Sequence, residues 1–145
     1  MRILALDVGE RRIGVAVSDP SGVLASPLTV IQSAGPRRDV ERVLELAREQ
    51  EAERVVVGMP VSMDGVRRQQ AQRVQEFCDR LSDQAEIPVI TWDERLTTVE
   101  AERRMREAGL SSKKRKERRD AAAAAVLLQA YLESLRMNRA EPLGG

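Results

Sequence analysis

Two short apolar runs, separated by a charged turn, open the chain and constrain its fold more than any other feature. The runs cover residues 3–6 and 13–17. Apolar runs on either side of a polar break that contains glycine predict two antiparallel strands joined by a tight turn. The first run is apolar at every position, which is typical of a strand covered on both faces in an α/β sheet. Asp7 follows it directly, either as a turn residue or as a ligand held at the end of the strand.

The rest of the chain changes from strand patterns to alternating strand and helix patterns. Further strands are predicted at 23–30, 54–58 and 88–92, and helices at 37–50, around the apolar stripe Val74, Phe77, Cys78 and Leu81, at 97–108 and at 120–136. Three antiparallel strands followed by βα units predict a mixed five-stranded sheet with helices on both faces, the ribonuclease H-like arrangement. The length predicts a single domain over residues 1–137, followed by a disordered tail at 138–145.

Composition excludes several kinds of chemistry. The chain of 145 residues has one cysteine, Cys78, and no histidine, so an intrachain disulfide and histidine-based catalysis or metal binding are excluded. Asp7 and Glu10 interrupt any apolar signal segment, and no apolar run approaches the ~18 residues of a membrane helix. We therefore expect a cytoplasmic protein without a membrane partner, whose chemistry comes from carboxylates, hydroxyls, lysine or a bound ion.

Strand direction sorts the acidic residues. The carboxyl ends of the first, fourth and fifth strands should lie at one edge of the sheet, where open α/β sheets place their sites. Asp7 and Glu94 follow the first and fifth strands, and Asp64 lies in the loop after the fourth. Asp120 opens the last predicted helix and can reach the same edge through the loop before it. Asp19 ends the antiparallel second strand, so it should lie at the opposite edge as a turn residue.

Carboxylates that converge without histidine are typical of sites for hard divalent ions. One or two Mg²⁺ or Mn²⁺ ions, held by Asp7, Glu94 and Asp120, can activate water and stabilise the leaving oxygen of a phosphodiester. Each acid also has a structural interpretation: Asp7 as a turn residue, Glu94 paired with Arg95, and Asp120 as a helix N-cap. Their joint placement at one edge favours the catalytic and metal-binding hypothesis.

Basic residues gather at the same predicted edge. The whole chain is nearly balanced, with 24 basic and 23 acidic residues, so their distribution matters more than net charge. A charged run is commonly a solvated face, but two runs beside an acidic cluster favour phosphate binding and a nucleic-acid partner. Aromatic residues make up 2% of the chain, which favours recognition of backbone and shape. The candidate nucleic-acid-binding residues are Arg11, Arg12, Lys113, Lys114, Arg115 and Lys116.

Four blocks of the sequence, in this order, resemble the YqgF/RuvX family, whose members are described as pre-16S rRNA nucleases and as Holliday-junction-resolvase-like. The blocks are Asp7-Val8-Gly9 with Arg12-Ile13-Gly14-Val15-Ala16, Val57-Gly58-Met59-Pro60 with Met63-Asp64-Gly65, Asp93-Glu94-Arg95-Leu96-Thr97-Thr98, and Asp120 before an alanine-rich helix. The resemblance covers nearly the whole chain except the tail. It implies a metal-dependent nuclease that acts on structured RNA in 5′-end maturation of 16S rRNA, with Asp7, Glu94 and Asp120 as catalytic acids.

The sequence departs from resolvases at one position and leaves other functions open. Resolvases carry an acid close after the fourth strand, where this chain has Gly58-Met59-Pro60, and we interpret Asp64 further along as a helix cap. A resolvase-like endonuclease acting on branched DNA is one alternative. A non-catalytic RNA-binding assembly factor is another. An ATP-binding domain of the actin or sugar-kinase type is a third, although such proteins need two domains to close over a nucleotide.

Overall fold

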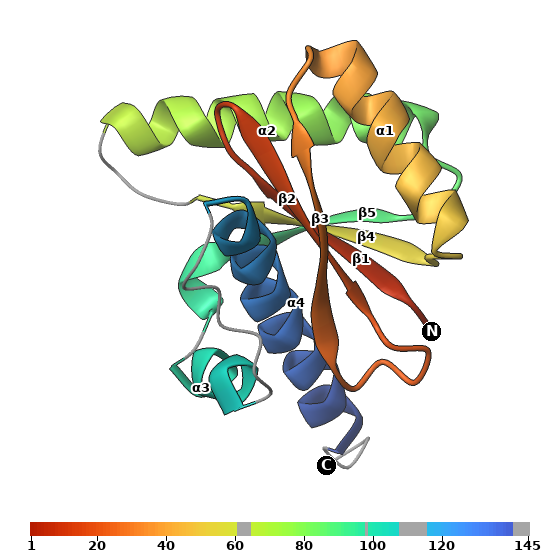
Figure 1. Ribbon diagram of the computed structural model, residues 1–145, viewed down its shortest axis with the longest axis vertical. Coiled ribbons are helices and arrows are strands. Elements are labelled where there is room, and N and C mark those ends of the chain that lie inside the picture. Colours follow the sequence, from red (N-terminus) through yellow and green to blue (C-terminus); the bar gives the residue numbers. More distant parts are fainter. Residues whose placement is uncertain (61–64, 98, 108–115, 141–145) are drawn as a thin grey trace.

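A computed structural model describes residues 1–60, 65–97, 99–107 and 116–140. Its centre is a five-stranded mixed sheet in the order β3-β2-β1-β4-β5, with helices on both faces (Figure 1). The strands are β1 (Ile3–Val8), β2 (Arg12–Ser18), β3 (Ala25–Gln32), β4 (Arg54–Met59) and β5 (Val89–Asp93). The helices are α1 (Pro36–Glu49), α2 (Gly65–Gln84), the 3₁₀ helix η1 (Glu94–Leu96), α3 (Val99–Glu107) and α4 (Lys116–Ala140). The predicted fold class is confirmed.

Strand directions place the candidate acids as predicted. β1 pairs antiparallel with β2 and parallel with β4, and β4 pairs parallel with β5. The carboxyl ends of β1, β4 and β5 therefore lie at one edge of the sheet, and the turn after β2 lies at the opposite edge. Asp19 is a turn residue there, because its carboxylate accepts hydrogen bonds from the backbone N–H groups of Val23 and Leu24 at 2.8 and 2.9 Å.

Each face of the sheet has its own apolar core. Side chains of α1 and α2, including Val40, Val43 and Leu81, pack with Leu4 and Leu6 of β1 on one face. On the other face, α4 covers the alternate β1 residues Ile3 and Ala5 (Figure 1). Because side chains alternate between the faces of a strand, Asp7 belongs to the α4 face. Burial on both sides explains why the first apolar run of the sequence shows no alternation.

The last helix differs from the prediction at both ends. It begins at Lys116, four residues before Asp120, so Asp120 lies inside the helix and its interpretation as an N-cap is wrong. Lysine, glutamate and arginine are good helix formers, and residues 116–119 continue the helix where a basic loop was expected. At the other end α4 runs to Ala140, so residues 138–140 are helical although they were assigned to a disordered tail. Residues 141–145 lie outside the described residues.

The remaining predictions agree within a few residues. α3 begins at Val99, close to the predicted start, and Thr97 closes η1 by donating its N–H to the Glu94 carbonyl at 3.1 Å. Thr98 and Asp64 lie outside the described residues, as does the segment 108–115 with Lys113, Lys114 and Arg115. Among the helices that the structure describes, none is both long and apolar enough to cross a membrane.

Candidate active site

Close packing of α4 on β2 brings Asp120 to Asp7. Asp7 is the register partner of Gly14 in the β1–β2 pair. A Cβ atom at Gly14 would lie 2.0 Å from the backbone carbonyl oxygen of Asp120, a distance that no real Cβ tolerates. The absence of a side chain at position 14 therefore lets α4 rest on the sheet at the level of Asp7. The strand and the helix, far apart in sequence, place two carboxylates side by side.

A second glycine supports the same approach of α4 from the neighbouring strand. A Cβ at Gly58 of β4 would lie 2.2 Å from the Leu127 Cδ1 atom of α4. Both glycines stand in the sequence motifs, but their packing role was not predicted. Glycine inside a strand is a known signal for close approach of another backbone. That signal indicates a contact without naming the partner, which only the structure supplies.

Glu94 reaches the same edge at the end of β5. The neighbouring Asp93 is held by its own local contacts: it accepts the Arg95 N–H at 2.9 Å and pairs with the Arg95 Nη2 atom at 2.7 Å. These bonds order the turn that begins η1. Asp93 is therefore occupied as the cap of η1, whereas Glu94, half-buried, is the acid next to Asp7 in electrostatic terms.

The electrostatics of Asp7 link the three acids. Burial, and after it the charges of Asp120 and Glu94, together raise the pKa of the Asp7 carboxyl from 3.8 to about 6. Strongly perturbed carboxyl groups of this kind concentrate at functional sites. Asp120 and Glu94 thus each lie close enough to Asp7 for their charges to act on its carboxyl.

Arg12 forms an ion pair with Asp120 that was not predicted from the sequence. Its Nε atom lies 3.0 Å from Asp120 Oδ2, and both side chains are about one third exposed. Although the separation is short, the N–H is not aimed at the oxygen, and Oδ2 has no hydrogen-bond partner within the described part of the chain. Arg11, by contrast, is exposed in the β1–β2 turn. Of the predicted basic residues after α3, only the start of α4 at Lys116 is described.

The carboxylates of the three candidate acids suit a hard divalent ion, although they do not form an enclosed site. Among the described residues, no three acidic or cysteine side chains lie close enough together to enclose a metal ion. All three candidate ligands nevertheless offer carboxylate oxygens, the ligands that Mg²⁺ and Mn²⁺ prefer. The buried Asp120 Oδ2 atom has an ion pair with Arg12 but no hydrogen bond within the described residues, and burial together with the charges of Asp120 and Glu94 raises the pKa of Asp7. A cation would relieve both conditions, so the residues fit such an ion.

Comparison with known proteins identifies the family. The family model RuvX, described as Holliday junction resolvase, matches residues 1–134. The chain belongs to this family. A protein of Chloroflexus aurantiacus named "Putative pre-16S rRNA nuclease" is 48% identical over 136 residues, which cover 94% of this chain and 89% of that protein. A protein of Desulforudis audaxviator with the same name is 42% identical over 139 residues, covering 96% of this chain and 99% of that protein.

Solved structures of resolvases share the fold. RuvC of Thermus thermophilus in complex with a Holliday junction substrate superimposes with a TM-score of 0.66 at 20% identity, covering 99% of both chains. The fowlpox virus Holliday junction resolvase gives a TM-score of 0.57 at 15% identity, covering 92% of this chain and 99% of that one. At these identities the likeness establishes the ribonuclease H-like arrangement of this chain, and its site has to be argued from its own residues.

Proposed function

We propose that this chain is a metal-dependent nuclease that processes the 5′ end of pre-16S rRNA in the cytoplasm. The observation that carries the proposal is the electrostatic coupling of Asp120 and Glu94 to the half-buried Asp7 at one edge of the sheet. Proteins 42% and 48% identical, named for pre-16S rRNA cleavage, support the choice of substrate. Family membership supports hydrolysis of a phosphodiester bond.

Each residue has a distinct role in the proposed site. Asp7, Glu94 and Asp120 would hold one or two Mg²⁺ or Mn²⁺ ions through their carboxylates. A divalent ion bound there lowers the pKa of a coordinated water and offsets charge on the phosphate. Asp7 is fixed by a central strand and Asp120 by a helix packed on that strand's neighbour, so the two acids keep their separation. Rigid elements of this kind position a reacting phosphate better than loops do.

The basic residues would bind the nucleic-acid backbone. Arg11 is exposed beside the site, and Arg12 already contacts Asp120, so its guanidinium can bridge the acid cluster and a phosphate. The segment with Lys113, Lys114, Arg115 and Lys116 leads into the same helix that carries Asp120. Contacts of this type hold a strand in register without reading its sequence.

The test compares Asp7→Asn with Asp19→Asn on a pre-16S rRNA fragment that retains its 5′ extension. Asn keeps the shape of the acid but removes its charge, so we expect Asp7→Asn to slow cleavage by about 100-fold or more. Asp19→Asn is the matched control, because Asp19 lies at the opposite edge of the sheet. Metal-dependent cleavage that survives Asp7→Asn would rule out this site.

A branched-DNA substrate belongs in the same assay, because the family is described by Holliday junction resolution. Faster metal-dependent cleavage of a four-way DNA junction than of the rRNA fragment would favour the resolvase alternative. Binding of either substrate without any cleavage, with or without Mg²⁺ or Mn²⁺, would favour a non-catalytic assembly factor.

A further inference from the structure

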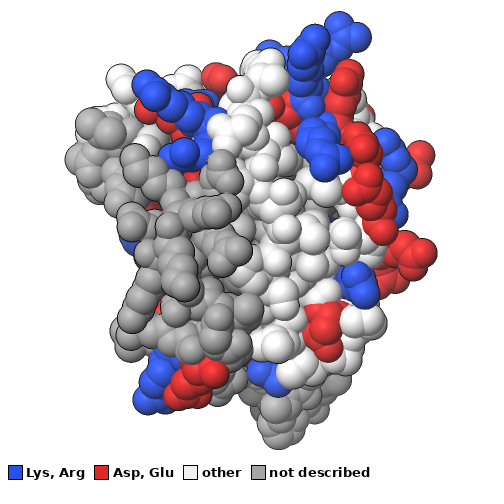
Figure 2. Space-filling view, in the orientation of Figure 1, with Lys and Arg blue, Asp and Glu red and all other residues white. Residues whose placement is uncertain are grey.

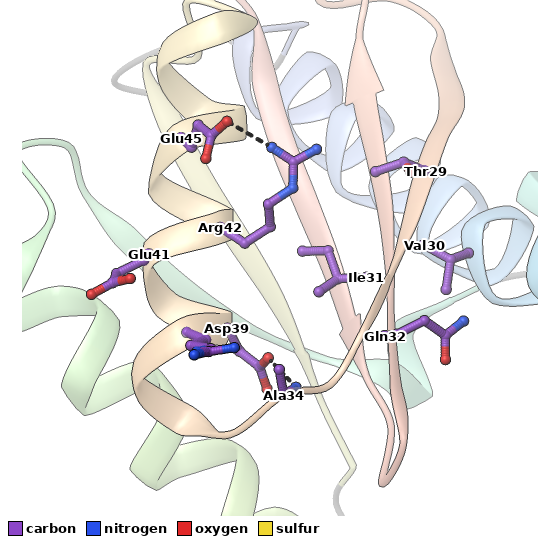
Figure 3. A pocket seen from close by; sticks show the side chains of 10 residues that line it. Thr29, Val30, Ile31, Gln32, Ala34, Asp39, Glu41, Arg42 and Glu45 are labelled. Atoms are coloured by element: carbon purple, nitrogen blue, oxygen red, sulfur yellow. Dashed lines mark hydrogen bonds and ion pairs between the residues drawn. The ribbon is translucent and has the colours of Figure 1, made fainter.

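Asp39 is a buried acid that the proposed function does not use. It lies in the first turn of α1 and is 5% exposed. Its Oδ2 atom accepts a hydrogen bond from the Ser33 hydroxyl at 2.6 Å, and its Oδ1 atom accepts one from the Ala34 N–H at 2.9 Å. Figure 3 shows the second bond at one end of the groove of about 460 Å³ between β3 and α1. Because a buried carboxylate is costly unless its oxygens are bonded, the groups that it holds indicate its role.

Both bonds go to residues that precede α1 rather than to the helix itself. An acid that caps a helix bonds the free N–H groups of its first turn. The N-cap of α1 is Gly35, which makes no side-chain hydrogen bond, and the helix begins at Pro36. A negative charge near a helix N-terminus is favourable in itself, but that effect requires neither burial nor these partners. Asp39 instead fixes Ser33 and Ala34, where the chain leaves the sheet after β3.

The segment that Asp39 fixes supports the turn between β1 and β2. The Ser33 N–H donates a hydrogen bond to the Arg11 carbonyl at 2.9 Å, which continues the β2–β3 ladder past the end of β3. Within the turn, the Gly9 N–H donates to the Arg12 carbonyl at 2.8 Å. Asp39 is therefore connected to the basic turn through one intermediate residue, Ser33, whose hydroxyl it binds.

This end of the hairpin is held from two sides. On the α4 face, the Arg12 Nε atom lies 3.0 Å from Asp120 Oδ2, and on the side of α1 the Ser33 N–H holds the Arg11 carbonyl. In Figure 1 the turn and the start of α1 lie at the same end of the molecule, and Figure 2 shows charged side chains of both signs on the surface there. Glu10 is an exposed acid in the same turn, so the placement of the two arginines matters more than their number.

We propose that Asp39 is a positioning residue for nucleic-acid binding. Through Ser33 it keeps the backbone of Arg11 and Arg12 ordered at the edge of the sheet where Asp7 lies. A turn that is ordered before it binds a phosphate loses less conformational entropy on binding. The inference rests on the part of the proposed function that assigns phosphate binding to these two arginines.

Salt-dependent RNA binding by variants of the full chain tests this role without requiring cleavage. Asp39→Ala removes both hydrogen bonds, whereas Asp39→Asn retains them, because the Ser33 hydroxyl can accept as well as donate. With a labelled pre-16S rRNA fragment, we expect Asp39→Ala to bind at least about fivefold more weakly than wild type. It should also lower the slope of log affinity against log salt by up to about 1.4, about 0.7 for each of two phosphates. Asp39→Asn should bind like wild type.

A double-mutant cycle separates positioning from a general loss of structure. In a chain that also carries Arg11→Gln/Arg12→Gln, Asp39→Ala should change neither the affinity nor the slope, because its effect acts through those side chains. A merely structural acid would weaken binding to the same extent in both backgrounds. Ser33→Ala removes only the hydroxyl and is a milder second variant, for which we expect a smaller effect with the same dependence on the arginines.

Gln129→Ala is the matched control, because it loosens the other end of β3. Gln129 is 2% exposed, accepts a hydrogen bond from the Ala25 N–H at 2.9 Å and donates one to the Val23 carbonyl at 3.1 Å. This variant should lower thermal stability, as Asp39→Ala does, and leave the RNA affinity and the salt slope as in wild type. Melts followed by circular dichroism show which temperature keeps every variant folded during the binding assay.

Additive effects in the double-mutant cycle would overturn the proposal, and so would equal salt slopes for Asp39→Ala and wild type. Either result leaves the proposed nuclease function intact, because cleavage and its loss in Asp7→Asn are measured separately. Coupling of Asp39 to the two arginines in a chain that never cleaves RNA would instead support the positioning role and contradict the nuclease assignment.

Discussion

Asp7 makes the stability of the fold depend on pH in an unusual direction. In the native structure its carboxyl pKa is raised from 3.8 to about 6, chiefly by burial, so the folded chain binds a proton that the unfolded chain releases. Between these two values the native state holds more protons, and the free energy of unfolding should fall as pH rises from about 4 to about 6. Above that range Asp7 is ionised in both states, and its full penalty remains, about 2 to 3 kcal/mol.

Urea unfolding of wild type and Asp7→Asn between pH 4 and pH 7.5 measures this effect. We expect Asp7→Asn to be the more stable protein at pH 7.5 and to lose that advantage toward pH 4. Asp19→Asn provides a control of opposite sign, because hydrogen bonds from Ser21 and the Leu24 backbone lower the pKa of Asp19 to about 2. Its contribution is fully present above pH 3.8 and is lost only as pH falls through 2, so Asp19→Asn should be less stable than wild type by a constant amount from pH 4 to pH 7.5. Equal pH profiles for wild type and Asp7→Asn would contradict the assignment.

Single residues differ in how far the sequence reveals their roles. The separation of Asp7 from Asp19 was predictable, because strand direction alone assigns them to opposite edges. The ion pair between Arg12 and Asp120 was not, because its partners lie on elements far apart in the chain. Local patterns describe a residue and its near neighbours, whereas this contact depends on how α4 crosses β2.

Among the elements, α4 determines whether the acids meet at all. It rests directly on Gly14, so Gly14→Ala should push the helix away from β2 and displace Asp120 from Asp7. The obstructing atom is a backbone oxygen, which cannot rotate away as a side chain can. We expect a loss of roughly 2 to 4 kcal/mol in the free energy of unfolding, together with loss of cleavage.

Gly22→Ala is the comparison for this experiment, because it alters a glycine in a surface turn. Gly22 has φ near 73°, so alanine there strains the backbone without touching α4. Both variants should lower stability in urea unfolding, but only Gly14→Ala should reduce cleavage of folded protein. Normal cleavage by Gly14→Ala would show that the spacing of α4 and β2 does not set the site.

The strands were predicted more accurately than the start of α4. The strands were found because their apolar runs are short and bounded by turn residues, as at 54–58. The start of α4 was missed because residues 116–119 lack apolar periodicity, although their side chains favour a helix. The stripe that begins after Asp120 was therefore interpreted as the whole helix. Charge-rich helix ends show little apolar periodicity. Such residues become helical because the turns that follow them pack against the rest of the protein.

At the scale of the whole molecule, topology was the most predictable property. Once three antiparallel strands precede two βα units, right-handed crossovers leave few arrangements, and the observed strand order is one of them. The placement of Asp7 and Glu94 at one edge follows from that topology, whereas that of Asp120 depends on how α4 packs on β2. The groove beside β3 does not follow from it either, because it depends on where α1 lies on the sheet and which of its faces remains uncovered.

Charge balance at this scale predicts how the molecule binds a polyanion. With 24 basic and 23 acidic residues, the chain as a whole attracts RNA weakly, so binding must come from local basic groups. Each phosphate contact to a single strand contributes about 0.7 to the slope of log affinity against log salt. Lys113→Gln/Lys114→Gln should therefore lower that slope by about 1.4.

Fluorescence anisotropy with a labelled rRNA fragment, measured from low to high salt, provides the slope. Arg48→Gln/Arg103→Gln removes the same number of charges from exposed positions on α1 and α3. This control should shift affinity only slightly and leave the slope as in wild type, because its arginines touch no phosphate. If both double variants behave alike, the basic segment before α4 is a solvated face, and RNA binding must come from other basic residues such as Arg11 and Arg12.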